Sequence, residues 1–196
     1  NIFSMTDYES TYKNLKDTDS IAYLKPASLE HFLNHEIKSS FTIDWNQKLT
    51  ILELGCGTGS LFEEGYESHH IIAIDISQTA INYAKQNNVN NIIFKESDLT
   101  KELDFKSNTF DFILDSHCLH CLTSNSDRTM FFENVKRLLG PQGVLSIESM
   151  IYHSEMLFDD QFRYKDNILY DNNNTAIRYI PSSRELEDEV LQFGFE

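Results

Sequence analysis

The chain has 196 residues, of which 40% are hydrophobic, and its acidic residues outnumber the basic ones to give a formal net charge of −15. This length and apolar content fit a single domain with a real core, residues 1–196. The negative charge argues against a bare nucleic-acid backbone as substrate and against an anionic membrane surface as partner, because both attract basic proteins.

Neither an apolar run of transmembrane length nor a signal peptide is recognisable in the sequence. The three cysteines are an odd number, which does not suggest a framework of disulfides. We therefore expect a cytoplasmic protein with reduced cysteines. The composition does not indicate its oligomeric state.

Residues 1–47 are expected to form a cap segment that precedes the core. Residues 1–20 are polar with interspersed aromatics, including Tyr8 and Tyr12, and they predict a loop or a short helix. Pro26 then precedes a helical pattern. The apolar face of this pattern carries Leu29, Phe32, Leu33 and Ile37.

The chain is organised around residues 50–60, where a short apolar strand that contains Glu53 runs into a glycine-rich turn. The glycines stand at alternate positions, Gly55, Gly57 and Gly59. Glycine lets the backbone turn sharply and approach a ligand closely. Ser60 and Glu63 predict a capping box and a following helix, whose first N–H groups and dipole would face that ligand. Such units bind nucleotide-like cofactors at the carboxyl edge of a parallel sheet.

Further strands follow in order. An apolar run over 70–74 ends at Asp75 and predicts the second strand. An acid at this tip can accept hydrogen bonds from both hydroxyls of a ribose. Ser77 is expected to cap a helix through about Asn87, and its buried side is predicted to hold Ala80, Ile81 and Ala84.

The third strand is expected over 91–95, the fourth over 110–114 and the fifth over 144–149. The helix between the last two, 126–139, should bury Phe131, Val135 and Leu138. Polar residues follow the third and fourth strands. They include Ser97, Asp98, Asp115, Ser116, His117, Cys118, His120 and Cys121.

The run Glu-Leu-Gly-Cys-Gly-Thr-Gly that starts at Glu53 resembles motif I of the class I S-adenosylmethionine-dependent methyltransferases. Its G-x-G-x-G spacing differs from the dinucleotide fingerprint G-x-G-x-x-G, and no lysine follows as in a P-loop. The resemblance covers residues 48–150 closely. It implies a Rossmann-like three-layer α/β/α sandwich with a mostly parallel sheet. The family's last two antiparallel strands have no counterpart here, so we expect a sheet edge that is incomplete at the C-terminus.

The resemblance also implies S-adenosylmethionine as the cofactor. Asp75 would bind its ribose, Asp98 its adenine amino group, and Asp115 would line its methionine end. For Asp98, a loop-capping or helix-capping role is the alternative. The full set of expected cofactor-binding residues is Glu53, Gly55, Cys56, Gly57, Gly59, Asp75, Ile76, Ser97, Asp98, Leu99, Asp115 and Ser116.

His117 and His120 follow the fourth strand, whose carboxyl end faces the transferring methyl group in this family. A histidine at either position could remove a proton from the acceptor. The alternative is a histidine that packs on the cofactor or holds a loop in place. We expect no metal, because Cys118 and Cys121 form a single pair and a zinc site usually shows a second one.

Residues 151–181 are rich in aromatic side chains and are expected to form a lid over the acceptor, with a hairpin turn near 171–174. The alternative is a satellite core in which these aromatic side chains pack together. Contacts with the acceptor are predicted for Tyr8, Tyr12 and Tyr152. Residues 182–196 should form a last helix, capped by Ser182 and Glu185. Its buried face would carry Leu186, Val190 and Leu191.

We expect methyl transfer to a small-molecule acceptor by in-line displacement. The acidic balance favours a neutral or cationic acceptor, such as an amine, over a phosphorylated one. The first alternative is a protein methyltransferase, or a cofactor-binding subunit that acts through a partner. The second, an NAD-dependent oxidoreductase, would require a different glycine spacing.

Overall fold

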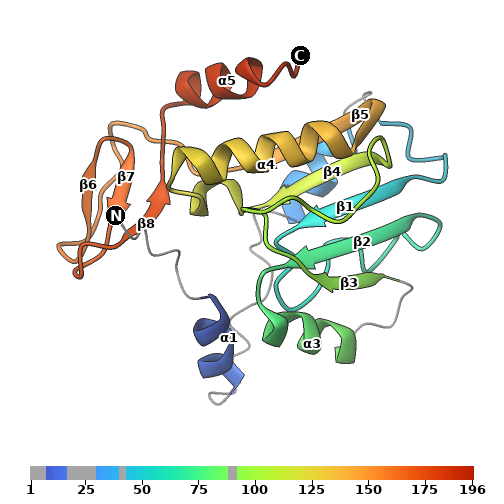
Figure 1. The fold of residues 1–196 in the computed structure, drawn as a ribbon, viewed down its shortest axis with the longest axis horizontal. Coiled ribbons are helices and arrows are strands. Elements are labelled where there is room, and N and C mark those ends of the chain that lie inside the picture. The colour runs from blue at the N-terminus through green and yellow to red at the C-terminus, as the bar shows by residue number, and fades with distance from the viewer. Residues whose placement is uncertain (1–7, 17–29, 40–42, 88–91) are drawn as a thin grey trace.

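The computed structural model describes residues 8–16, 30–39, 43–87 and 92–196. The expected helix residues Pro26 and Leu29 lie outside these ranges. Five parallel strands form the central sheet in the order β3-β2-β1-β4-β5 (Figure 1). They are β1 (Thr50–Leu54), β2 (His70–Asp75), β3 (Ile93–Glu96), β4 (Phe110–Ser116) and β5 (Leu139–Glu148). The predicted Rossmann-like sheet is confirmed.

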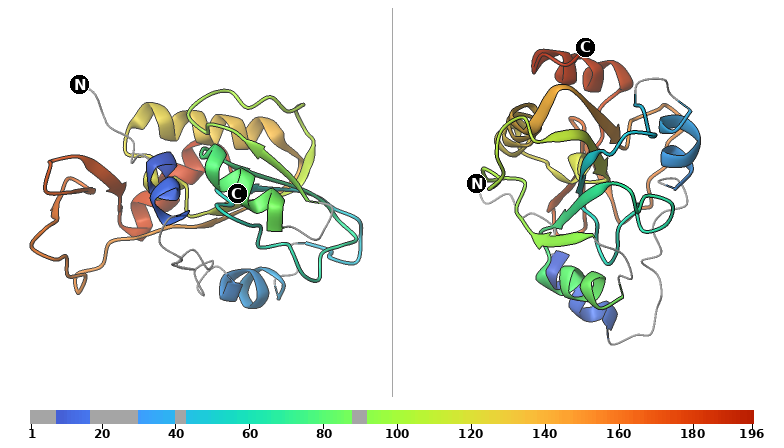
Figure 2. Two further views of the ribbon diagram at one scale, coloured as in Figure 1. Left: turned by 90° about the horizontal axis from the view of Figure 1, so that it is seen from below. Right: turned by 90° about the vertical axis from the view of Figure 1, so that its right-hand side faces the viewer.

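Helices cover both faces of this sheet, because its strands are apolar on both sides. The described helices are α1 (Tyr8–Lys16), the π-helix η1 (Phe32–Ile37), α3 (Gln78–Asn87), the 3-10 helix η2 (Leu119–Cys121), α4 (Asn125–Leu138) and α5 (Ser183–Gln192). The right-hand view of Figure 2 shows η1 and α4 on opposite sides of the sheet. The predicted three layers are therefore present.

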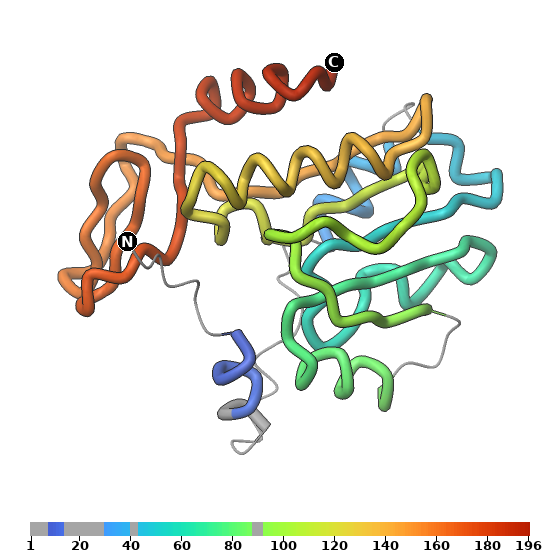
Figure 3. The backbone as a smooth tube through the Cα atoms, in the orientation of Figure 1, coloured from blue at the N-terminus to red at the C-terminus, as the bar shows by residue number. Residues whose placement is uncertain are grey.

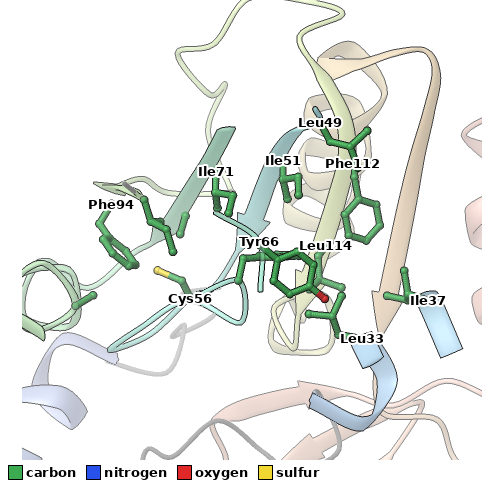
Figure 4. Close-up of a cluster of buried hydrophobic side chains, with 14 of the residues drawn as sticks. Leu33, Ile37, Leu49, Ile51, Cys56, Tyr66, Ile71, Phe94, Phe112 and Leu114 are labelled. Atoms are coloured by element: carbon green, nitrogen blue, oxygen red, sulfur yellow. The ribbon is translucent and has the colours of Figure 1, made fainter. Parts of the chain in front are cut away.

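Each face has its own apolar cluster. On one face, Leu33 and Ile37 of η1 pack with Tyr66 and with side chains of the strands (Figure 4). On the other face the predicted α4 residues are buried, namely Phe131, Val135 and Leu138. The helix α3 also buries its predicted residues, Ala80, Ile81 and Ala84.

The predicted helix after the glycine loop is wrong. Residues 60–69 form turns and bends, although Ser60 N donates to Glu63 Oε1 at 2.9 Å as in half of a capping box. Two features oppose a helix. Gly65 has φ of +81°, which a right-handed helix does not allow. Phe62 and Tyr66, with ring centroids 4.9 Å apart, are buried on the sheet face that a helix would cover.

The insertion 151–181 forms a second, antiparallel sheet in the order β6-β7-β8. Its strands are β6 (Arg163–Lys165), β7 (Ile168–Tyr170) and β8 (Ala176–Tyr179). The predicted hairpin of β7 and β8 is confirmed, whereas β6 was not expected. Asp166 and Asn167 both have positive φ, which suits a two-residue hairpin turn between β6 and β7. Figure 3 shows this small sheet beside one end of the central sheet.

The last helix α5 has the predicted capping box of Ser182 and Glu185. Leu186 and Val190 are half-buried against the core, but Leu191 is 59% exposed, so its predicted burial is wrong. The residues after α5 contain no strand. Of the helices that the structure describes, none combines the length and the apolar character required to span a membrane.

Candidate active site

A cavity of about 550 Å³ lies at the carboxyl ends of the central strands. Its wall includes the glycine loop after β1, the residues that follow β2, β3 and β4, and side chains of α1. Parallel α/β sheets bind their ligands at this edge, where the strand order reverses. A volume of this size is typical of a site for a cofactor or another small molecule.

All the expected cofactor-binding residues except Asp115 line this cavity. Both histidines, His117 and His120, line it too, as do Tyr8 and Tyr12 of α1. Tyr152 does not. Its ring stacks on Tyr164 of β6 with a centroid distance of 4.8 Å, within the insertion.

The glycine loop has no room for side chains at two positions. Gly55 has φ of +77°, and a Cβ there would lie 2.2 Å from Cys118 Sγ. Gly57 has φ of +58°, and a Cβ there would lie 2.8 Å from the Tyr12 hydroxyl. Both backbone conformations favour glycine, so this loop can approach a bound molecule closely.

Glu53 is almost fully buried beneath the loop. Its carboxylate accepts hydrogen bonds from the Ser60 hydroxyl and from the backbone N–H of Leu61 at 3.2 Å. The hydroxyl of Ser116 at the end of β4 donates to it at 3.2 Å. The carboxylate therefore connects the loop to β4 and fixes the shape of the cavity wall.

The two acids that follow β2 and β3 are held by local hydrogen bonds. Asp75 accepts from Gly57 N and from Ser77 N, each at 2.9 Å, and burial raises the pKa of this carboxyl. Asp98 accepts from the backbone N–H and the hydroxyl of Thr100 at 2.9 and 2.7 Å. This is the loop-capping alternative for Asp98, yet its side chain also faces the cavity. The two uses are compatible because a carboxylate has about four acceptor sites.

Asp115 lies elsewhere than the resemblance implied. Its side chain is fully buried and accepts hydrogen bonds from Cys118 N at 3.0 Å and Leu119 N at 3.3 Å, at the start of η2. Burial raises the pKa of this carboxyl to about 7. The physical reason is that β4 continues through Ser116, so side chains alternate and Ser116, not Asp115, faces the cavity.

The two histidines have different surroundings. His117 has φ of +68°, a strained conformation for a residue with a side chain, and its Nε2 lies 3.5 Å from Glu148 Oε2. That oxygen is buried and accepts no hydrogen bond from the described residues. His120 is 5% exposed, and its Nδ1 accepts from Met150 N at 3.3 Å. Burial, together with the charge of Arg178, lowers the pKa of His120 to about 3, so this imidazole is neutral and weakly basic.

Two residues of the site were missed by the sequence analysis. Glu148 ends β5 and pairs in register with Ser116 of β4. The sequence signal that could have identified Glu148 is an acid at the tip of the strand next to the one that the histidines follow. Arg178 of β8 lines the cavity and is the contribution of the insertion to its described wall. No local pattern in the sequence indicates that Arg178 approaches the central sheet.

Helix α1 is held over the cavity by polar contacts. The Tyr8 hydroxyl donates to Cys121 Sγ at 2.9 Å. Glu9 accepts hydrogen bonds from the hydroxyls of Ser77 and Thr79, both at 2.6 Å. These hydrogen bonds, above all the one from Ser77, lower the pKa of Glu9 to about 2. Within the described ranges the three cysteines form no disulfide, and no group of three or more His, Cys, Asp or Glu residues could hold a metal ion.

The fold and the site define a Rossmann-like protein with a cavity for a nucleotide-like cofactor. Residues 51–143 match a family model described as a methyltransferase domain. This match and the fold support a class I S-adenosylmethionine-dependent methyltransferase.

Two curated relatives are similar to this chain in sequence. The methyltransferase YqeM of Bacillus subtilis is 28% identical over 61% of this chain and 51% of its own length. The phosphoethanolamine N-methyltransferase of Plasmodium falciparum is 29% identical over 72% of this chain and 52% of its own length. The chain thus spans about half the length of these curated relatives.

A solved structure has a similar fold. It is the 1,6-didemethyltoxoflavin-N1-methyltransferase of Burkholderia thailandensis, with bound 1,6-didemethyltoxoflavin and S-adenosylhomocysteine. Its TM-score is 0.62 with 20% identity, and the match covers 97% of this chain and 76% of that one.

Proposed function

We propose that this chain binds S-adenosylmethionine in the cavity and transfers its methyl group to a small-molecule acceptor. One observation carries the proposal. The glycine loop, the acids after β2 and β3, and the histidine after β4 are far apart in sequence but line the same cavity. The match to the methyltransferase domain supplies the identity of the cofactor, and the geometry is compatible with it.

The residues present fit that cofactor. Asp75 would accept hydrogen bonds from the ribose hydroxyls, and Asp98 from the adenine amino group. The backbone N–H of Leu99 would meet a ring nitrogen of the adenine. The loop at Gly55 and Gly57 leaves the space that the rest of the molecule needs. When bound, S-adenosylmethionine supplies an activated methyl group on a sulfonium centre.

The protein's own chemical task is to orient the acceptor and remove its proton. We assign the base to His117, because its Nε2 lies near the buried Glu148 carboxylate and its ring lines the cavity. Glu148 would orient the imidazole and stabilise its protonated form, as a carboxylate does in other histidine bases. The neutral, weakly basic His120 is a poorer choice and would instead position the loop after β4.

A small molecule is the preferred acceptor because the cavity is partly covered by α1 and by β8, both of which contribute side chains to its wall. Two relatives are named for small-molecule acceptors, phosphoethanolamine and 1,6-didemethyltoxoflavin, whereas a third is named for a malonyl group carried by an acyl-carrier protein. Tyr8 and Tyr12 are proposed to contact the acceptor from the α1 side. Tyr152 is not proposed, since it does not line the cavity.

Two measurements test the proposal. Calorimetry should detect binding of S-adenosylhomocysteine and little binding of NAD. Incubation with isotope-labelled S-adenosylmethionine and a metabolite extract should label small molecules, whereas a protein extract should remain unlabelled. Tight NAD binding without S-adenosylhomocysteine binding would reject the cofactor. Label in proteins alone would favour the protein methyltransferase.

A further inference from the structure

The cavity contains one unusual charge. Its described wall includes several acids but only one basic residue other than histidine, Arg178, in a chain with a net charge of −15. Arg178 is half-buried and lies on β8, opposite Leu169 of β7. One guanidinium nitrogen, Nη1, donates to the backbone carbonyl of Ile177 at 2.7 Å. No ion pair with Arg178 is present among the residues that the structure describes.

Four of the five acids of the wall have other partners, among them Glu63 with Ser60 N, and the fifth, Glu30, is exposed. Glu53 accepts from Ser60, Asp75 accepts from the backbone of Gly57, and Asp98 pairs with Lys101 at 2.9 Å. These contacts hold the loops of the cofactor side in place. They leave the guanidinium of Arg178 without an anionic partner from the described part of the protein.

The charge of Arg178 acts on groups of the cavity wall that are themselves neutral. These groups are Tyr8, His120 and Cys121. Burial, followed by the charge of Arg178, lowers the pKa of His120 to about 3, and burial raises the pKa of Tyr8 well above its usual value. A half-buried guanidinium among neutral groups has lost part of its hydration without gaining a counter-charge. Its planar set of donors matches a carboxylate or a phosphate in a bidentate arrangement.

We propose that Arg178 binds an anionic group of the methyl acceptor, a carboxylate or a phosphate. This inference rests on the proposed function. Its geometric basis is the packing of β8 against η2, the short helix of His120. The ring centroid of His120 lies 5.3 Å from that of the proposed base His117. The reacting atom of the acceptor must lie at His117. An anion at Arg178 would then be part of the same acceptor molecule.

This anionic acceptor differs from the neutral or cationic acceptor that the net charge of the chain favoured. The local charge decides, because Coulomb interactions inside a cavity are stronger and less screened than those with distant surface carboxylates. The insertion would thus set specificity through one cation on β8. Its aromatic residues pack among themselves, for example Phe158 on Tyr164 with centroids 5.4 Å apart.

The test uses the full chain and three variants. Arg178→Ala removes the charge, Arg178→Lys keeps it without the planar fork, and Arg184→Ala is the control. Arg184 lies on the exposed side of α5, where its Nε is 3.9 Å from Asp188. Each protein is first titrated with S-adenosylhomocysteine and with 5′-methylthioadenosine, which lacks the amino-acid end. Acetate, inorganic phosphate, benzoate and phenyl phosphate are then titrated at saturating S-adenosylhomocysteine, with acetamide and benzamide as neutral matches.

The expected result is binding of at least one anion and a preference for it over its neutral match. Arg178→Ala should weaken that binding at least tenfold, Arg178→Lys less, and Arg184→Ala not at all. Affinity for S-adenosylhomocysteine should stay within a few-fold in every variant. A protein that binds S-adenosylhomocysteine but shows no preference for anions would overturn the inference.

A second result would also overturn it. If Arg178→Ala weakens S-adenosylhomocysteine but not 5′-methylthioadenosine, the anion at Arg178 is the carboxylate of the cofactor. Failure of the wild-type protein to bind S-adenosylhomocysteine at all would instead reject the proposed function. The two failures are therefore distinguishable.

Discussion

The cofactor side of the cavity and its insertion side are built in different ways. On the cofactor side, each residue stands at or just after the carboxyl end of a parallel strand, as Gly57 and Asp75 do. On the insertion side, Arg178 reaches the cavity because the small sheet β6-β7-β8 packs near η2. The first side follows from strand order alone, whereas the second depends on long-range packing. A site assembled in this way can keep its cofactor while the insertion determines the acceptor.

The largest effect is expected from Gly57→Val. This change places a side chain at φ of +58° and 2.8 Å from the Tyr12 hydroxyl, in the wall of the cavity proposed for the cofactor. We expect S-adenosylhomocysteine binding to fall about a hundredfold or more, from strain together with steric exclusion. Calorimetry on the purified variant measures it.

Gly65→Val is the matched control for backbone strain. Gly65 has φ of +81°, but a Cβ there meets nothing within 4 Å. It should lower stability to a similar extent without changing cofactor affinity. Equal losses of affinity in both variants would mean that strain, and not the space beside Gly57, is responsible.

His117→Ala tests the chemistry on the border between the two sides. We expect turnover to fall about 10²- to 10⁴-fold, the usual contribution of a general base, with cofactor affinity retained. The loss should be smaller for acceptors whose own proton is more acidic. Single-turnover assays with labelled cofactor measure it, and full turnover in this variant would leave positioning alone as the catalytic device.

Glu148→Gln refines the same prediction, because it keeps the shape of the side chain and removes its charge. Turnover should fall about tenfold, the equivalent of one charge-assisted contact. Affinity for S-adenosylhomocysteine should stay unchanged, whereas a purely structural role for Glu148 would weaken cofactor binding as well.

Asp75→Ala tests the cofactor side by itself. Two charge-assisted hydrogen bonds to ribose hydroxyls, each worth about 1.5–3 kcal/mol, predict at least a tenfold weaker affinity for S-adenosylhomocysteine. Because Asp75 also accepts from Gly57 N and Ser77 N, Asp75→Asn is the conservative comparison that keeps one acceptor oxygen. A folded Asp75→Ala protein with unchanged affinity, checked by circular dichroism, would exclude the ribose role.

The sequence predicts this cofactor side well for a physical reason. Apolar runs, capping residues and glycines each determine the structure of their own short stretch of sequence. The bounds of β1, β2 and α3 could therefore be predicted to within about two residues. The carboxyl ends of parallel strands then meet at one edge, which brings Glu53, Asp75 and Asp98 together without further information.

The errors lie where long-range packing decides. The helix signal at Ser60 and Glu63 is real, but the buried rings of Phe62 and Tyr66 and the left-handed Gly65 replace the helix with turns. The lid role of the aromatic insertion stays a prediction, but the residue that it brings to the described cavity wall is Arg178, while Tyr152 stacks on Tyr164 within the insertion. No local pattern in the sequence indicates which strand of the small sheet packs beside the cavity.

The smallest expected effect concerns Asp115, which shows the difference between the two kinds of position. Asp115 is buried, whereas Ser116, the next residue of β4, lines the cavity. The ordinary pKa of an aspartate, about 3.9, applies to the unfolded chain. In the folded protein burial raises it to about 7. Between these values the folded state holds a proton that the unfolded state releases, so this group makes the free energy of unfolding fall as pH rises from about 4 to about 7.

Asp115→Asn removes this titration while keeping a carbonyl oxygen for the N–H groups of Cys118 and Leu119. We expect the variant to lose the downward slope, at most about 1.4 kcal/mol per pH unit, and to match or exceed wild-type stability near pH 8. Urea unfolding at several pH values measures it, with Asp104→Asn as the control that removes a fully exposed carboxylate. Cofactor affinity should be unchanged, because Asp115 does not line the cavity. An unaltered slope together with weaker S-adenosylhomocysteine binding would return Asp115 to the cofactor side.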